Sequence, residues 1–346
     1  MLPRTTVVAA LLALLLPAQT RPREGRGGGT PPRLEHLTVQ ERSFQSPALG
    51  RTVNYGVFLP KEYETPEAKE RRYPLLLWLH GMFEDHRRFG VRGGAQVLDK
   101  MVGAGDLPAV VFVTANGDRA SFYVNGKDTE AYEDLIVKDL LAHLGQTYRI
   151  AESREQRAIL GVSMGGFGAL KIALKHPELF GTVAAHSAAI LPPDPDNLGP
   201  RFKRMLESDF GRRMGLDRIY GNPIDKAKWR GENPIALAET IAKDQVRGLQ
   251  IYFDCGSADR YEFDETNLAL HEALDRRGIA HTWKLVDGGG HGWESGYNGK
   301  CLPESLAFVA RALSAKAGRA GLEGLLAPGG EGGQGAPASR PAAKDR

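Results

Sequence analysis

A serine framed by glycines is the residue best placed for nucleophilic chemistry in this sequence. Residues 161–166 read Gly-Val-Ser-Met-Gly-Gly, directly after the apolar run 158–160 and before a helical pattern that begins at Phe167. At a sharp strand-to-helix turn the central Ser adopts a strained backbone conformation, and small flanking residues let strand and helix approach. Its hydroxyl then points out at a helix N-terminus, where developing negative charge is favoured. Because G-x-S-x-G alone is common in glycine-rich chains, the position of the motif carries the prediction that Ser163 is a nucleophile.

A serine hydroxyl needs a base, and His291 has the best position among the nine histidines. It lies in the loop Gly288-Gly289-Gly290-His291-Gly292, just past the mixed apolar run 282–286. Where a nucleophilic serine stands on a strand-to-helix turn of this kind, the acid and the histidine follow it in the chain in that order. The glycines let the loop around His291 bend toward the sheet edge. His271 falls within a helical pattern and His281 opens a strand, so both fit the role less well. We predict that His291 is the general base.

The acid that orients this histidine is expected on the loop after the preceding strand. The apolar run 249–253 is followed by Asp254 and, after four more residues, by Asp259. Asp259 lies on the turn, whereas Asp254 belongs to the strand end and fits local hydrogen bonding. Glu262 and Asp264 come later, at the solvated start of a helix. We predict that Asp259 fixes the imidazole tautomer and stabilises the imidazolium that forms.

Backbone N–H groups are expected to bind the oxyanion of the tetrahedral intermediate. One comes from Met164, the residue after the nucleophile, and the second from the loop after an early strand. The run 75–79 is followed by His80-Gly81-Met82, where Gly81 allows a sharp turn that directs the Met82 N–H inward. An ordinary turn is the alternative interpretation of this His-Gly pair. Gly81 is also predicted to contact the substrate.

Short apolar runs alternate with helical patterns along the middle of the chain. Residues 52–59 alternate between apolar and polar, which indicates a half-buried strand. Continuous runs, typical of strands covered on both faces, occupy 74–79, 109–113, 158–160, 182–185, 249–253 and, in mixed form, 282–286. Helical periodicity marks 132–144, 167–174, 268–274 and 306–313. The alternation predicts an α/β domain with a mostly parallel sheet, whose reactive residues follow the carboxyl ends of strands.

With these residues in view, the chain resembles the esterase D family of α/β-hydrolases. The family includes S-formylglutathione hydrolases, feruloyl and acetylxylan esterases, and the antigen 85 mycolyltransferases. The resemblance covers roughly 34–315 and rests on five motifs in the right order: Leu79-His80-Gly81-Met82, Ser121-Phe122-Tyr123-Val124-Asn125, Gly161-Val162-Ser163-Met164-Gly165-Gly166, Asp254-Cys255-Gly256-Ser257-Ala258-Asp259 and Gly289-Gly290-His291-Gly292-Trp293. It implies an α/β-hydrolase fold with Ser163, Asp259 and His291 as nucleophile, acid and base, and an oxyanion donor at Met82. The stretch 190–235 resembles the small cap that shapes the substrate pocket.

The substrate is predicted less sharply than the reaction. Trp293 beside His291, together with Phe122, Tyr123 and Tyr297, is a candidate aromatic wall for a phenolic acyl group or a sugar ring; ordinary aromatic packing is an equal alternative. The histidines are scattered and lack ligand spacing, so we expect neither a metal nor a cofactor. The partner we expect is a small-molecule or carbohydrate-linked ester.

The two ends of the chain differ from its middle. Residues 1–20 read as a signal peptide, with Arg4 before the apolar run 7–16, although an uncleaved anchor is the alternative. Residues 21–33 read as a disordered linker and 317–346 as a disordered tail, which leaves 34–316 as the esterase domain. We therefore expect a secreted or periplasmic protein, in contact with a membrane only if the leader is uncleaved.

Charge and cysteine content narrow the classes further. The net charge is +3, but 34–316 holds 36 basic and 38 acidic residues, so the basic excess lies in the ends. No basic block is interleaved with aromatic residues, which argues against a nucleic-acid partner. Cys255 and Cys301 are the two cysteines; one disulfide is possible in an exported chain, and a small buried thiol at Cys255 is the alternative.

Three functions remain open on the sequence. The first is an exported serine esterase that cleaves short acyl or hydroxycinnamoyl esters through an acyl-enzyme on Ser163. The second is an acyltransferase of the antigen 85 type, which uses the same triad and passes the acyl group to an alcohol. The third is a non-catalytic binding protein on a hydrolase fold, against which an intact triad argues.

Overall fold

The computed structural model describes residues 33–127, 130–292 and 297–326. All of them belong to one unit of the chain, Pro31–Arg346. The predicted signal peptide and all but the last residue of the predicted linker lie outside the described residues. Within the described part of the chain, no helix combines the length and the apolar character needed to cross a bilayer.

Eight strands form one sheet in the order β1-β2-β4-β3-β5-β6-β7-β8. The first two contacts, β1 with β2 and β2 with β4, are antiparallel, and all the others are parallel. The strands are β1 (Leu37–Ser46), β2 (Arg51–Pro60), β3 (Leu75–Leu79), β4 (Val111–Ala115), β5 (Arg157–Val162), β6 (Thr182–His186), β7 (Gln250–Gly256) and β8 (Thr282–Val286). The expected mostly parallel sheet is confirmed.

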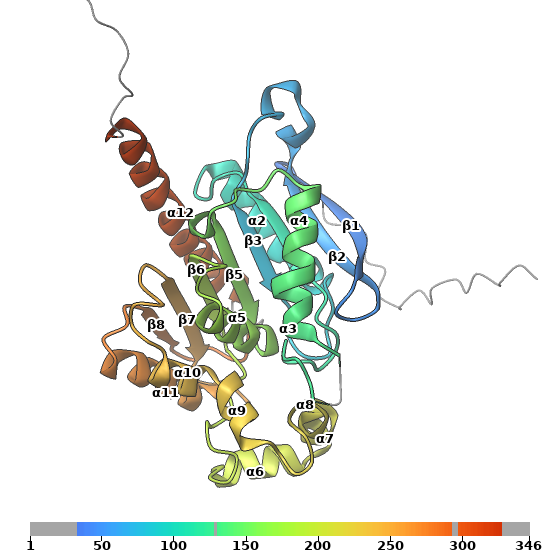
Figure 1. Cartoon of the computed structure of the whole chain (residues 1–346), viewed down its shortest axis with the longest axis vertical. Helices are drawn as coiled ribbons and strands as arrows, with labels where there is room; N and C mark the ends of the chain where they lie inside the picture. The colour runs from blue at the N-terminus through green and yellow to red at the C-terminus, as the bar shows by residue number, and fades with distance from the viewer. Residues whose placement is uncertain (1–32, 128–129, 293–296, 327–346) are drawn as a thin grey trace, which may run out of the picture. The chain divides into compact units, whose positions relative to one another are not determined.

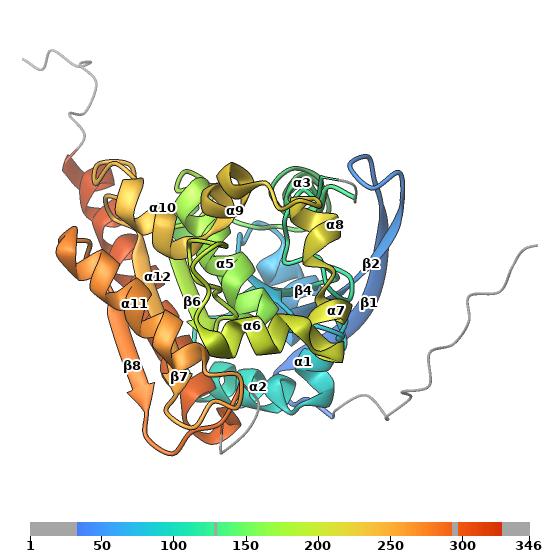
Figure 2. The same ribbon diagram turned by 90° about the horizontal axis from the view of Figure 1, so that it is seen from below.

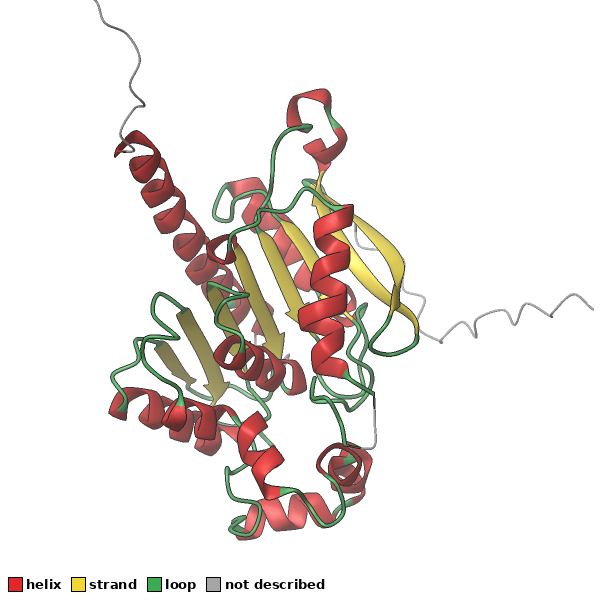
Figure 3. Ribbon diagram, in the orientation of Figure 1, coloured by secondary structure: helices red, strands yellow, loops and turns green. Residues whose placement is uncertain are grey.

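Helices cover both faces of this sheet (Figure 3). They are α1 (Arg88–Val91), α2 (Gly94–Ala104), α3 (Tyr132–Asp134), the π-helical η3 (Leu135–Leu140), α4 (Leu141–Thr147), α5 (Met164–Lys175), α6 (Pro200–Glu207), α7 (Asp209–Met214), α8 (Leu216–Tyr220), α9 (Lys226–Glu232), α10 (Pro234–Thr240), α11 (Phe263–Arg276) and α12 (Cys301–Leu326). Short 3-10 turns lie at η1 (Lys61–Glu64), η2 (Pro66–Ala68), η4 (Arg154–Gln156) and η5 (Tyr297–Gly299).

Two hydrophobic clusters, one on each face, explain why the central strands are apolar throughout. The helices α4, α5, α10 and α11 pack on one face, and α2 and α12 pack on the other (Figure 1). Every residue of β3, β4 and β6 is therefore buried. Such two-sided burial produces continuous apolar runs rather than alternation, which is the signal that predicted these strands.

The cap segment lies at the end of the sheet where the parallel strands end. Helices α6, α7, α8 and α9 fall within 190–235, and Figure 1 shows them below the arrowheads of the central strands. Figure 2, which looks at this end, shows them in front of the sheet. The segment predicted as a cap therefore lies over the ends of the strands that precede the predicted site residues.

Two features differ from the sequence-based expectation. β1 was not predicted, because an edge strand exposed along much of its length gives no strong apolar signal. Helix α12 continues to Leu326, so 317–326 is helical where a disordered tail was expected. The composition of that stretch offers a reason, since Ala, Leu, Glu and Arg are good helix formers. Residues 327–346 lie outside the described residues.

Candidate active site

Ser163 occupies the sharp turn between β5 and α5. Its backbone has φ +57° and ψ −118°, a conformation that L-residues rarely adopt. A Cβ added to Gly161 would come within 2.2 Å of the Gly165 carbonyl oxygen, and one added to Gly165 within 2.0 Å of the Leu79 carbonyl oxygen. Both the strained serine and the need for small neighbours are therefore confirmed.

The three residues predicted as nucleophile, base and acid lie in one chain of hydrogen bonds. His291 Nε2 is 2.9 Å from Ser163 Oγ, and His291 Nδ1 is 2.7 Å from Asp259 Oδ2. Because a carboxylate only accepts, Nδ1 carries the hydrogen and Nε2 is left to accept from the serine hydroxyl. The three side chains come from the loops after β5, β7 and β8, which end at the same edge of the sheet.

Asp259 is buried and is held by donors on three sides. Besides His291, the Tyr261 N–H donates to its Oδ1 at 2.9 Å and the Cys255 thiol to its Oδ2 at 3.4 Å. Burial opposes ionisation, but the His291 hydrogen bond and charge and the other donors hold the pKa of Asp259 below its usual value. The carboxylate is thus available to orient the imidazole.

Both cysteines are free and buried, so the possible disulfide is not formed and the alternative of a small buried thiol holds. Burial, with the neighbouring Asp259 charge adding to it, raises the pKa of the Cys255 thiol far above its usual value. The thiol therefore keeps its hydrogen and acts as a donor toward Asp259.

The loop after β3 lies directly against the serine turn. A Cβ on Gly81 would be 3.6 Å from Ser163 Cβ and 3.6 Å from the Val162 carbonyl oxygen. Among the backbone hydrogen bonds of the described residues, none is donated by the N–H of Met82 or of Met164 outside regular elements. The structure thus places Gly81, Met82 and Met164 beside Ser163, with the N–H groups of Met82 and Met164 unengaged in these backbone hydrogen bonds.

Two cavities open beside this site and share two wall residues, Phe83 and Met214. The smaller, about 130 Å³, is lined by Ser163 and His291 among others. The larger, about 680 Å³, lies between the segment around 118–132 and helices α7 and α8. Its wall carries charged side chains: Asp118, Arg119, Glu130, Arg213 and Arg218.

The aromatic residues that line the smaller cavity differ from those predicted. Phe122, Tyr123 and Tyr297 are buried in the core and line neither cavity, so their predicted role is wrong; Trp293 lies outside the described residues. The smaller cavity is lined instead by Phe83, Phe210, Tyr261 and Phe263. Tyr261 and Phe263 follow Asp259 so closely that the sequence could have pointed to them, whereas Phe210 on α7 gave no signal.

A second serine, histidine and aspartate form a similar chain elsewhere. His186 Nδ1 is 2.9 Å from Asp254 Oδ2, and His186 Nε2 is 3.0 Å from Ser305 Oγ. Asp254 also accepts a local hydrogen bond from the Tyr252 hydroxyl at 2.9 Å. The local hydrogen bond predicted for Asp254 is therefore present, but Asp254 also contacts His186. The sequence gave no sign of that second contact.

The two histidines set aside as bases lie away from Ser163, at the opposite end of β8 from His291. His271, on α11, and His281, just before β8, contact each other and Asp275. This grouping corrects the expectation that the histidines are too scattered to bind a metal together.

Known proteins resemble this chain in sequence. The family model described as "Putative esterase" matches residues 46–308. An esterase of Mycobacterium tuberculosis (strain ATCC 25618 / H37Rv) is 29% identical over 270 residues, which are 71% of this chain and 54% of that protein. The S-formylglutathione hydrolase of Paracoccus denitrificans (strain Pd 1222) is 26% identical over 287 residues, 75% of this chain and 92% of that protein.

Solved structures give the same picture. A ferulic acid esterase superimposes with a TM-score of 0.64 at 26% identity, covering 80% of this chain and 99% of that one. An S-formylglutathione hydrolase from Agrobacterium tumefaciens superimposes with a TM-score of 0.63 at 22% identity, covering 82% and 98%, which supports the fold alone. The chain spans about half the length of the Mycobacterium tuberculosis relatives that it matches.

Proposed function

Because the chain belongs to the esterase family whose model matches residues 46–308, we propose that it hydrolyses carboxylic esters through an acyl-enzyme on Ser163. The observation that carries the proposal is the hydrogen-bond chain Ser163–His291–Asp259, with distances of 2.9 and 2.7 Å, at a strained serine beside an open cavity.

The reaction begins when His291 Nε2 takes the Ser163 proton as Oγ attacks the ester carbonyl. The resulting oxyanion accepts hydrogen bonds from the N–H groups of Met82 and Met164, each of which contributes roughly 3 kcal/mol to lowering the barrier. The imidazolium, stabilised by Asp259, then gives its proton to the departing alcohol. Water then attacks the acyl carbonyl while it gives a proton to His291. The bond between the acyl carbon and Ser163 Oγ breaks, the imidazolium returns the proton to Oγ, and the carboxylic acid leaves.

The volumes and lining residues of the two cavities suggest how an ester divides between them. The small cavity beside Ser163, with its aromatic wall, fits a short acyl group. The larger cavity carries three arginines and two acidic residues, which suits a polar alcohol such as a sugar. A hydroxycinnamoyl ester is the second candidate, favoured by the aromatic wall and by the likeness to a ferulic acid esterase at 26% identity.

A panel of esters tests this proposal. Wild type and Ser163→Ala are assayed on p-nitrophenyl acetate, p-nitrophenyl butyrate, methyl ferulate, acetylated xylan and S-formylglutathione, with folding checked by circular dichroism. We expect hydrolysis of short acyl esters, with the feruloyl ester as the second candidate, and its loss in the variant. Hydrolysis that persists in Ser163→Ala would move the nucleophile elsewhere.

Two other functions of the same site are distinguished by simple additions. A transferase would form an acylated sugar when a sugar acceptor is supplied, which product analysis detects. A binding protein without catalysis would remain folded yet fail to react with a fluorophosphonate probe at Ser163.

We also propose that residues 34–316 are the esterase domain, with a cap at about 190–235, and that the protein is exported. The support for export is the apolar run 7–16 after Arg4. N-terminal sequencing of protein recovered from the culture medium or periplasm tests it, since export predicts a mature chain that starts near residue 21.

A further inference from the structure

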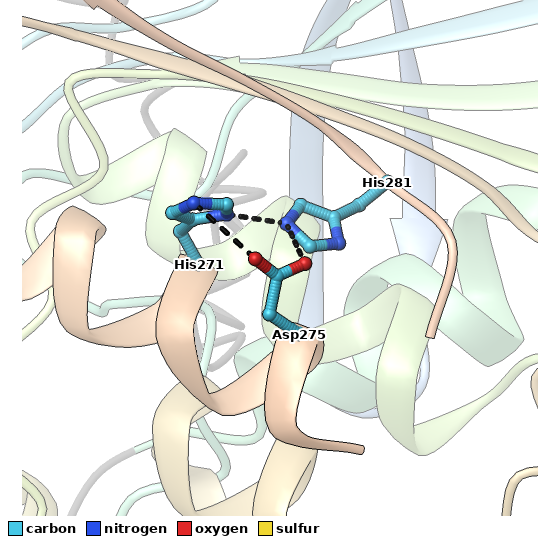
Figure 4. A group of neighbouring side chains, drawn as sticks. All are labelled: His271, Asp275 and His281. Carbon is cyan, nitrogen blue, oxygen red and sulfur yellow. Dashed lines mark hydrogen bonds and ion pairs between the residues drawn. The ribbon is translucent and has the colours of Figure 1, made fainter. Parts of the chain in front are cut away.

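Two imidazoles and a carboxylate converge at the amino end of β8, away from the candidate active site. His271 and Asp275 lie one turn apart on α11, and His281 is the residue just before β8. Figure 4 shows the three side chains directed toward one another. One ligand atom from each lies within 4.8 Å of the other two. These are residue types and separations that a single metal ion can bridge.

His281 is held in the form that a metal needs. Its Nδ1 is 2.8 Å from the carbonyl oxygen of Ile279, which can only accept, so Nδ1 carries the hydrogen. The lone pair is therefore on Nε2, the atom that faces His271 Nδ1 at 2.7 Å and Asp275 Oδ1 at 3.8 Å. Anchoring one ring nitrogen on a backbone carbonyl is how proteins orient histidine ligands.

His271 completes the group from the helix side. Its Nε2 is 3.5 Å from Asp275 Oδ2 and its Nδ1 contacts His281, so the imidazole lies between the other two ligands (Figure 4). Without a metal, the two facing nitrogens share one hydrogen. A metal ion replaces that hydrogen, and the two nitrogens then separate to about 3.3 Å, the distance set by tetrahedral bonds of about 2.0–2.1 Å.

Packing fixes the rings but leaves one side open. The His281 ring stacks on Phe253 with centroids 5.8 Å apart, and the His271 ring lies near-parallel to Trp283 at 6.3 Å. The His281 side chain is 4% exposed and that of Asp275 is 63% exposed. An ion can thus enter from solvent on the Asp275 side and keep water as its remaining ligand.

We propose that His271, Asp275 and His281 bind one Zn²⁺ ion, with water in the fourth position. Two imidazole nitrogens and one carboxylate oxygen suit zinc, whereas Ca²⁺ and Mg²⁺ prefer sets made of oxygen alone. The ion joins the last turn of α11 to the start of the edge strand β8. These elements follow the Asp259 loop and precede the His291 loop, so the ion stabilises the frame that carries both loops.

The ion takes no part in the proposed ester chemistry. β8 alone places roughly 16 Å of strand between His281 and the loop of His291. The proposal therefore does not rest on the esterase reaction, and it is tested by binding, spectra and stability rather than by turnover.

The test uses the full chain, free of an affinity tag and stripped with a chelator. Titration with ZnCl₂ is followed calorimetrically and by thermal unfolding, in wild type and in Ser163→Ala. We expect one ion per chain and, at 100-fold excess over the dissociation constant, a rise in Tm of about 5 °C or more. Substitution with Co²⁺ should give the intense visible bands of a tetrahedral site, and excess Mg²⁺ should not compete.

Matched variants assign the ligands. His281→Gln and His271→Gln should each weaken zinc binding by about 100-fold, and Asp275→Asn by about 10-fold. The control is Glu272→Gln, which removes an exposed carboxylate from the same helix outside the group and should leave binding unchanged. Because His281 is buried, the half-exposed His271 keeps the test decisive if His281→Gln fails to fold. Zinc binding that is absent in wild type, or unchanged in the folded His271→Gln, overturns the proposal.

Discussion

Two serine–histidine–aspartate chains of nearly equal hydrogen-bond geometry occur in this molecule. In the first, Ser163 Oγ is 2.9 Å from His291, whose other nitrogen is 2.7 Å from Asp259. In the second, Ser305 Oγ is 3.0 Å from His186, whose other nitrogen is 2.9 Å from Asp254. Hydrogen-bond distances alone therefore do not distinguish a catalytic Ser-His-Asp chain from one that only stabilises the fold.

Their surroundings separate the two chains. His186 and Ser305 are 0% exposed and Asp254 is 3% exposed, and none of the three lines a cavity near Ser163. Ser305 lies within the regular helix α12, where the Leu302 carbonyl oxygen, 3.0 Å away, competes for its hydrogen. Ser163, in contrast, has a strained backbone, backbone donors nearby and open space before it. Access, a strained serine backbone and nearby backbone donors therefore set the candidate site apart from the buried chain.

The second chain nevertheless supports the first. It links β6, β7 and α12 across the sheet face, and the carbonyl oxygen of His186 accepts the backbone N–H of Ser163 at 2.9 Å. We interpret the chain His186–Asp254–Ser305 as an anchor for the strand next to Ser163. Variants in the two chains should therefore separate loss of activity from loss of stability.

The largest effect is expected for Asp259→Asn. The amide cannot hold the imidazole in the tautomer that accepts from Ser163, so kcat should fall by about 10⁴-fold, or about 5.5 kcal/mol in the barrier. Turnover of p-nitrophenyl acetate measures this. The matched variant Asp254→Asn should keep most of its kcat at 25 °C; if it instead lost as much as Asp259→Asn, the two chains could not be assigned different roles.

The next effect is on stability. Asp254→Asn leaves buried His186 without its carboxylate partner, and the free energy of unfolding should fall by about 3 kcal/mol. Urea unfolding followed by circular dichroism measures the change. Asp259→Asn in the same assay provides the control, and a larger loss of stability there would contradict the anchoring role.

A smaller effect is expected for Ser305→Ala. The variant removes one hydroxyl from a buried chain and should lower the free energy of unfolding by about 1 kcal/mol, or Tm by about 2–4 °C. Esterase activity should persist, in contrast to Ser163→Ala. Differential scanning calorimetry and the acetate assay test both halves, and loss of turnover in folded Ser305→Ala would be inconsistent with our interpretation.

The smallest effect is expected on the free energy of unfolding at acid pH. Because the pKa of Asp259 is lowered in the folded protein, its ionisation stabilises the fold above the unfolded-state pKa, about 3.9, and this contribution is lost as pH falls through the folded value. Asp259→Asn should therefore lose less stability than wild type between about pH 5 and about pH 2. The free energy of unfolding of both proteins is measured as a function of pH. A steeper loss in Asp259→Asn than in wild type would contradict the prediction.

The positions of residues in glycine-framed loops directly after apolar runs were predictable, even where these residues lie far apart in the sequence. Ser163 and His291 stand in glycine-framed loops directly after apolar runs, so their positions followed from the sheet alone. Gly161 and Gly165 were predictable for the same reason, since close backbone approach leaves no alternative residue. The parallel strands were predictable because burial on both faces makes them uniformly apolar.

Contacts of residues that carry no such local signal were not predictable in this way. Ser305 meets His186 across 119 positions of the chain, and a serine within an apolar helix gives no sign of its partner. Phe210 reaches the small cavity only because α7 folds over the strand ends. The pair His271 and Asp275 has a visible helical spacing of four residues, but His281 joins it only through the turn before β8.

The division of the site into two cavities has a consequence for how substrate preference can change over time. Since Phe83 and Met214 are the wall residues common to both, most substitutions alter one cavity and leave the other intact. On the proposed division of the ester, selection, natural or in a directed-evolution library, can thus explore alcohol preference at Arg218, which lines only the larger cavity, while the acyl side is inherited unchanged. Epistasis between substitutions that change the acyl preference and substitutions that change the alcohol preference should concentrate at Phe83 and Met214.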